Sequence, residues 1–159
     1  MLATVAVGFT AMLVAWRERD EPGAVPLVVM FFGVCLWVSS YLFTLQSMTV
    51  EGKILWNELA WVGVVIIPPA WLLFAMEYTG RGRFIRPGYI AMLAIIPLVT
   101  VALALTSEAH SLLYSDSEIV RFQGQTLLNR VPGPWFWVVM SYTYLLGMLG
   151  SIPILGLVL

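Results

Sequence analysis

The stretch from Leu55 to Arg86 constrains the fold more than any other part of the chain. It begins with a polar and aromatic collar, becomes wholly apolar, carries Pro68-Pro69 near its middle and ends on Tyr78 and three arginines. From Trp56 to Tyr78 is about 23 residues, or roughly 34 Å as a helix, which is enough to cross a hydrocarbon core of about 30 Å. The stretch therefore predicts a membrane-spanning helix.

The composition supports lipid as the solvent for most of the chain. Of its 159 residues, 60% are hydrophobic and 11% are charged, whereas a typical soluble domain is about half apolar and about a quarter charged. So few charges would not cover a water-exposed surface of this size. The net charge of −1 argues against a nucleic-acid partner, because such proteins present basic patches. We expect a multi-pass protein of the cell membrane.

Five apolar runs predict an all-α bundle of five transmembrane helices in one sensor-like domain over residues 1–159: residues 1–16, 24–45, 55–78, 87–105 and 135–159. The first run, at about 16 residues, is short for a full crossing. The last reaches Leu159 with no polar residue after it, so we expect the functional unit to be longer. Residues 106–134 form the one sizeable loop.

Lysine and arginine in the short loops predict the orientation, because cytoplasmic loops carry an excess of them. The first and third loops hold five of the eight: Arg17, Arg19, Arg81, Arg83 and Arg86. The other side holds Lys53, Arg121 and Arg130. The N-terminus is therefore expected outside and Leu159 inside.

Two kinds of local structure are expected in the outer loop at residues 106–134. Ser107 to Tyr114 has a capping serine and an apolar side, which favours a short interfacial helix. Residues 117–122 and 126–131 are β-prone and flank Gln123-Gly124-Gln125, which predicts a small hairpin. At about 29 residues the loop is too short for an independent core, so we expect a lid over the bundle.

The central run holds most of the candidate site residues. Glu58 is a carboxylate about one turn inside a membrane helix, which is costly and marks either a functional contact or a group that reaches interfacial partners. Pro68 and Pro69 remove two backbone donors at mid-membrane, as a packed kink or as a hinge. Trp61 and Trp71 share one helical face around these prolines, as packing or as the wall of a pocket.

Other candidates lie outside that face. Glu77 precedes Arg81 by four residues, a spacing that favours an ion pair on a helix. His110 is either a solvated or capping residue or a pH-responsive or ligand-contacting one, and Tyr142 places a hydroxyl below the outer interface. Gly147 and Gly150, with Ser151, offer a small-residue surface for close helix contact, which suits a homodimer or a partner membrane subunit.

Motifs of enzymes and metal sites are not recognisable in the sequence. His110 is the single histidine and has no cysteine or carboxylate at ligand spacing on the same predicted helix. No nucleophile elbow, phosphate loop or HExxH motif occurs. We expect no metal, no cofactor and no catalytic residue in this chain.

An ordered set of motifs resembles the N-terminal seven-transmembrane sensor region of prokaryotic, especially archaeal, histidine kinases. The set covers nearly the whole chain: Ala15-Trp16-Arg17, Pro22-Gly23, Trp37, Pro68-Pro69-Ala70-Trp71-Leu72-Leu73-Phe74-Ala75, Glu77-Tyr78-Thr79-Gly80-Arg81, His110 with Leu112, Gly133-Pro134-Trp135-Phe136-Trp137 and Tyr142-Thr143-Tyr144. The resemblance implies two further spans and then cytoplasmic PAS, kinase or other output modules. Any kinase activity would belong to those modules.

The leading hypothesis is a sensory input region in the membrane. A small apolar or amphipathic ligand, or a state of the membrane, would act between the spans under the lid and bias two packings around Pro68-Pro69. Glu58, Trp61, Trp71 and Tyr142 are the expected pocket residues. The alternatives are a transport or channel subunit, which needs a continuous polar path, and a membrane scaffold or accessory subunit of a larger complex.

Overall fold

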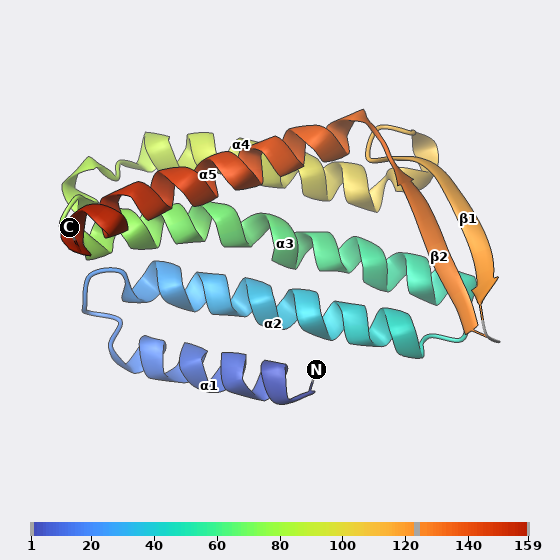
Figure 1. Ribbon diagram of the computed structural model, residues 1–159, viewed down its shortest axis with the longest axis horizontal. Coiled ribbons are helices and arrows are strands. Elements are labelled where there is room, and N and C mark those ends of the chain that lie inside the picture. The colour runs from blue at the N-terminus through green and yellow to red at the C-terminus, as the bar shows by residue number, and fades with distance from the viewer. Residues whose placement is uncertain (1, 123–124, 159) are drawn as a thin grey trace.

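A computed structural model describes residues 2–122 and 125–158 as five long helices and one β-hairpin (Figure 1). The elements, with two 3₁₀ turns, are α1 (Leu2–Arg17), α2 (Ala24–Gln46), α3 (Val50–Tyr78), η1 (Gly82–Phe84), α4 (Pro87–Leu105), η2 (Ser107–Ala109), β1 (Tyr114–Phe122), β2 (Gln125–Pro132) and α5 (Pro134–Val158). The predicted all-α membrane bundle is confirmed, since α2, α3, α4 and α5 are each long and apolar enough to cross a membrane. The helix α1 is apolar but shorter.

The helix α3 is the centre of the bundle. It packs on α2 on one side and on α4 and α5 on the other, while α1 packs on α2 (Figure 1). Two buried apolar clusters line α3 on its α4/α5 side: Trp61, Val65, Ala104, Leu113 and Val139 near the hairpin, and Leu72, Leu93 and Leu146 further along. The sequence stretch that most constrains the fold therefore forms the central helix of the structure.

Glycine and proline define the ends of the helices. Gly23, at φ 90°, precedes α2, and Gly80, at φ 74°, follows the end of α3; an L side chain would be strained in both conformations. Pro87 and Pro134 stand at the start of α4 and α5, where a missing N–H costs little. The hydroxyl of Thr49 caps α3 by accepting the amide hydrogen of Gly52 at 3.1 Å.

A close helix approach joins α2 to α3 at a pair of glycines. A Cβ on Gly63 would lie 2.5 Å from the carbonyl oxygen of Gly33 and 2.6 Å from the backbone nitrogen of Trp37. Glycine at both positions allows the two backbones to touch, as small residues do at many membrane helix interfaces.

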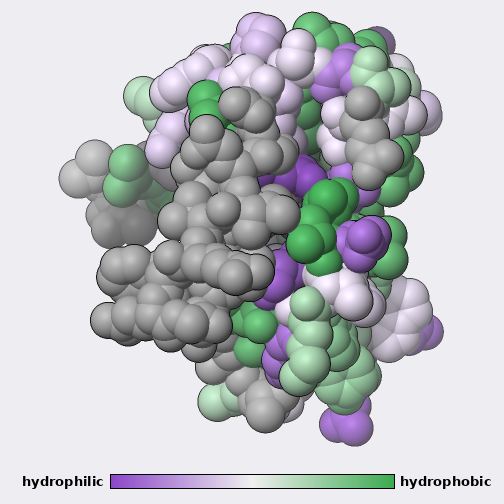
Figure 2. Space-filling model, turned by 90° about the vertical axis from the view of Figure 1, so that its right-hand side faces the viewer, coloured by the Kyte–Doolittle hydropathy of each residue, from purple (hydrophilic) through white to green (hydrophobic). Residues whose placement is uncertain are grey.

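The connections alternate between the two ends of the bundle. The loops α1–α2 and α3–α4 lie at one end with the C-terminus, and the loop α2–α3 lies at the other end with the hairpin (Figure 1). Figure 2 looks onto the hairpin end, where hydrophilic residues lie among apolar ones on the described part of the surface. This alternation is what the charge-based orientation requires, and the side that faces the cytoplasm is still a prediction.

Two local predictions need correction. The helix α3 begins at Val50, five residues before the predicted start, because Thr49 caps a polar turn that extends beyond the apolar run. The helix expected from Ser107 to Tyr114 is wrong: a 3₁₀ turn ends at Ala109, and β1 begins at Tyr114. The hairpin is confirmed with longer strands, paired antiparallel from Phe122–Gln125 to Tyr114–Pro132, while residues 123–124 of the predicted turn lie outside the described residues.

The predicted Glu77–Arg81 ion pair is also absent from the described residues. The helix ends at Tyr78, so Arg81 is no longer one turn along the same helical face. Glu77 instead accepts the amide hydrogen of Gly23 through Oε2 at 2.8 Å. The carboxylate thus ties the start of α2 to the end of α3.

Candidate functional site

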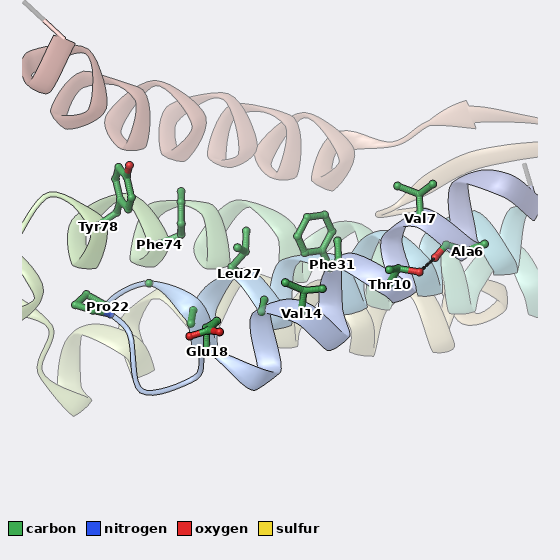
Figure 3. A pocket seen from close by; sticks show the side chains of 14 residues that line it. Ala6, Val7, Thr10, Val14, Glu18, Pro22, Leu27, Phe31, Phe74 and Tyr78 are labelled. Atoms are coloured by element: carbon green, nitrogen blue, oxygen red, sulfur yellow. Dashed lines mark hydrogen bonds between the residues drawn. The ribbon is translucent and has the colours of Figure 1, made fainter.

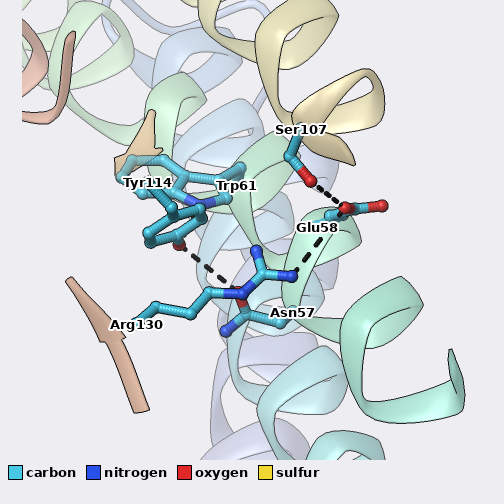
Figure 4. Close-up of polar contacts among 6 residues, drawn as sticks. All are labelled: Asn57, Glu58, Trp61, Ser107, Tyr114 and Arg130. Atoms are coloured by element: carbon cyan, nitrogen blue, oxygen red, sulfur yellow. Dashed lines mark hydrogen bonds and ion pairs between the residues drawn. The ribbon is translucent and has the colours of Figure 1, made fainter. Parts of the chain in front are cut away.

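A polar cluster lies where the hairpin meets the N-terminal part of α3. It consists of Asn57, Glu58 and Trp61 on α3, Ser107 on η2, Tyr114 at the start of β1 and Arg130 on β2 (Figure 4). We call these six residues the hairpin-end cluster. They come from α3 and from three elements that follow it much later in the sequence, and they join the hairpin to the helices.

Glu58 is the acidic member and is buried, with 8% of the residue exposed. Its Oε1 accepts a short hydrogen bond from the Ser107 hydroxyl and lies 4.0 Å from Nη2 of Arg130. A carboxylate inside a membrane protein requires such partners because an isolated buried charge costs several kcal/mol. The structure therefore links Glu58 to both η2 and the hairpin.

Tyr114 is the aromatic link of the cluster. Its hydroxyl accepts a hydrogen bond from Nε1 of Trp61 at 2.7 Å and donates one to Oδ1 of Asn57 at 3.3 Å. The Arg130 guanidinium lies over its ring, 4.4 Å from the centroid. Burial raises the pKa of Tyr114, against the smaller lowering by the Trp61 hydrogen bond and the Arg130 charge. The tyrosine is therefore a neutral donor at physiological pH.

Arg130 is the basic member and is incompletely paired. Only 8% of its side chain is exposed, and Nε and Nη1 are buried with no hydrogen-bond acceptor in the described part of the chain. Its distance to Glu58 exceeds that of a hydrogen bond. The guanidinium thus keeps donor capacity that the described cluster does not use.

His110 lies beside the cluster rather than in it. Its Nδ1 accepts the amide hydrogen of Leu112 at 3.3 Å, and its Nε2 lies 3.1 Å from the Thr106 hydroxyl. In the neutral ring this arrangement places the hydrogen on Nε2. Leu112 in turn accepts a hydrogen bond from the backbone of Trp135 through its carbonyl. The histidine therefore braces the turn that connects α4, the hairpin and α5.

The remaining predicted site residues lie deeper in the bundle, away from one another. Tyr142 donates to the carbonyl of Leu93 at 2.7 Å, which lacks a helical partner because Pro97 has no N–H. Trp71 donates to the carbonyl of Gly147 at 3.3 Å and covers Gly150. Part of the small-residue surface of α5 is thus used inside the chain.

Pro68 and Pro69 lie within an α3 helix that continues past them. Pro68 is buried, and Pro69 lines an apolar cavity of about 410 Å³ between α2, α3 and α4. A larger apolar cavity, of about 780 Å³, lies between α1, α2 and α3 (Figure 3). Its wall includes Phe74 and Tyr78 and none of the predicted site residues.

The structure therefore brings together only part of the predicted pocket. Glu58 and Trp61 meet in the hairpin-end cluster, but Trp71 and Tyr142 do not reach it. Sequence reasoning missed Ser107, Tyr114 and Arg130 as partners of Glu58. The one signal available was physical, since a carboxylate at that depth needs a donor or a cation nearby.

Comparison with known proteins identifies the family. The family model described as the N-terminal 7TM region of histidine kinase matches residues 1–158. No curated protein matches the chain significantly, and no solved structure does. The match covers almost the whole chain and agrees with the apolar helices, so it assigns the chain to a membrane sensory region without a kinase domain in these residues. The protein belongs to the family of N-terminal 7TM regions of histidine kinases.

Proposed function

We propose that this region detects a small ligand or a state of the membrane at the hairpin-end cluster and relays it through the helices to a cytoplasmic kinase. The observation that carries the proposal is the pairing of buried Glu58 with Arg130 on β2 and with Ser107 on η2. Charged groups at this depth are expensive and mark functional contacts by default. A bundle held only by packing would not need them.

The connection to α5 gives the cluster a route for relay. Arg130 is two residues before the end of β2 at Pro132, and α5 begins at Pro134. The backbone of Gly133 and Trp135 is hydrogen-bonded to Leu113 and Leu112. A change in the Glu58–Arg130 pair would therefore also move the start of α5, because the connection between them is short and hydrogen-bonded. This coupling supports a two-state switch.

Glu58→Gln in the intact receptor tests the proposal. Glutamine keeps an acceptor for Ser107 but removes the charge that faces Arg130, so we expect altered basal autophosphorylation with the fold retained. Glu51→Gln, an exposed residue in the first turn of the same helix, is the matched control and should leave the output unchanged. Unchanged output and unchanged thermal stability in Glu58→Gln would remove Glu58 from the site.

A further inference from the structure

We propose that the hairpin-end cluster binds a small monocarboxylate with a short apolar body, and that Arg130 takes its carboxylate. This inference rests on the proposed function and names the class of stimulus. It starts from the donors of Arg130 that the described cluster leaves unused.

A carboxylate fits those donors in geometry and charge. A guanidinium carries five N–H donors in a planar fork, yet Nε and Nη1 of Arg130 are buried without an acceptor among the described residues. Leaving a buried charged donor unpaired is costly. Carboxylates pair with arginine through two parallel charge-assisted hydrogen bonds, so a bound carboxylate would remove that cost.

Glu58 allows Arg130 to change partner. Its Oε1 already accepts the Ser107 hydroxyl, and its contact with Arg130 is 4.0 Å long. Arg130 can turn toward a ligand while Glu58 keeps its hydrogen bond. If Glu58 accepted two hydrogen bonds from the guanidinium, it would prevent Arg130 from changing partner.

The same carboxylate restricts the charge of the ligand. A second anion near Glu58 is repelled, and the repulsion grows with the charge of the ligand in a poorly solvated site. A monoanion therefore fits better than a dianion such as phosphate. A neutral amide would present an acceptor to Arg130 but no charge to its guanidinium.

The surroundings favour an apolar body. Trp61 meets the rings of Tyr114 and Phe136 edge to face, with centroids 6.3 and 6.2 Å apart. Leu113, next to Tyr114, is fully buried in the same apolar cluster. Ligand sites of this kind combine apolar walls with a few polar groups that orient the ligand, and a short alkyl chain matches them.

The test compares three probes on the wild-type chain in lipid nanodiscs. Butyrate, butyramide and inorganic phosphate are titrated while the thermal midpoint and tryptophan fluorescence are followed. We expect a saturable rise in the thermal midpoint with butyrate, and a much smaller one with butyramide or phosphate. No response to butyrate, or an equal response to butyramide, would overturn the proposal without any variant.

Two variants locate the effect. Arg130→Gln should weaken butyrate binding by about tenfold or more, as loss of a charge-assisted hydrogen bond does. Arg130→Lys, which keeps the charge, should fold and bind at intermediate strength. Arg86→Gln, an exposed arginine at the opposite end, should bind as the wild type does. Undiminished binding in Arg130→Gln or in Arg130→Lys refutes the assignment of Arg130.

The outcome is separable from that of the proposed function. If Glu58→Gln changes receptor output but butyrate does not bind, the cluster is a sensory site for another stimulus and the inference fails alone. If butyrate binds through Arg130 but neither Glu58→Gln nor butyrate changes the output, the binding site stands and the proposed function fails.

Discussion

The glycine contact between α2 and α3 makes a quantitative prediction about stability. In Gly63→Ala the new Cβ would lie 2.5 Å from the carbonyl oxygen of Gly33, and ordinary contact begins at 3.4 Å, so the backbones must separate by about 0.9 Å. The opposing atoms belong to the backbone and cannot rotate away. Overpacking of this kind costs about 1–3 kcal/mol, and the higher helix propensity of alanine recovers at most about 1 kcal/mol. With the full propensity gain the net loss relative to the wild type is up to about 2 kcal/mol, and relative to a helix glycine that is changed to alanine without a clash it is about 1–3 kcal/mol.

The measurement is an SDS unfolding titration in mixed micelles, followed by circular dichroism. Gly147→Ala in α5 is the matched control, because a Cβ there meets no atom within 4 Å. The control should be as stable as the wild type, or more stable by up to about 1 kcal/mol. If Gly63→Ala unfolds at the same SDS fraction as Gly147→Ala, the close approach of α2 and α3 is refuted.

Two further predictions concern tyrosine hydroxyls. Tyr142→Phe leaves the Leu93 carbonyl unpaired opposite Pro97 and should lower the free energy of unfolding by about 1 kcal/mol in the same titration. Tyr144→Phe, on a residue that is 71% exposed, is the control and should not change it measurably. Equal stability of the two variants would contradict the hydrogen bond from Tyr142 to Leu93. Because burial raises the pKa of Tyr114 above its value in the unfolded chain, the folded state keeps the proton longer, so its contribution is complete below about pH 10 and is lost as pH rises beyond it. A thermal-midpoint series should show a steeper alkaline decline in the wild type than in Tyr114→Phe, and parallel profiles would contradict the burial of that hydroxyl.

The length and spacing of the apolar runs predicted the helices well because a bilayer sets both. The same features did not predict the local structure of the segments that lie beyond the apolar runs. The first turn of α3 from Val50 is polar because it lies beyond the apolar run, and sequence reasoning assigned it to a loop. Leu112 and Leu113 suggested the apolar side of an interfacial helix, but Leu113 is fully buried in the core between η2 and β1.

Only one part of the candidate site, the position of Glu58, could be predicted from the sequence. The depth of Glu58 in its helix follows from the sequence, and so does its need for a partner. Which partner it takes depends on the register of the hairpin, which pairs Ser117 with Arg130 and Thr126 with Arg121. That register places Arg130 near the base of the hairpin, beside α5, and Arg121 near its tip. No periodicity within the helices contains this information.

The interhelical hydrogen bonds of α5 indicate that this helix, rather than α1, would transmit a movement of the hairpin through the membrane. Three hydrogen bonds between different helices join α5 to its neighbours among the described residues: Trp135 to Thr100, Tyr142 to the Leu93 carbonyl and Trp71 to the Gly147 carbonyl. They are spread along the helix from the hairpin end to its second half. By contrast, α1 is attached to α2 mainly by packing, with one weak contact from the Cys35 thiol to the Val5 carbonyl at 3.8 Å. Interhelical hydrogen bonds join specific atoms of neighbouring helices and so add register-specific contacts to their packing. A displacement that begins at Arg130 would therefore reach α3 directly through Glu58 and, by way of α5, both α3 and α4, with α1 least affected.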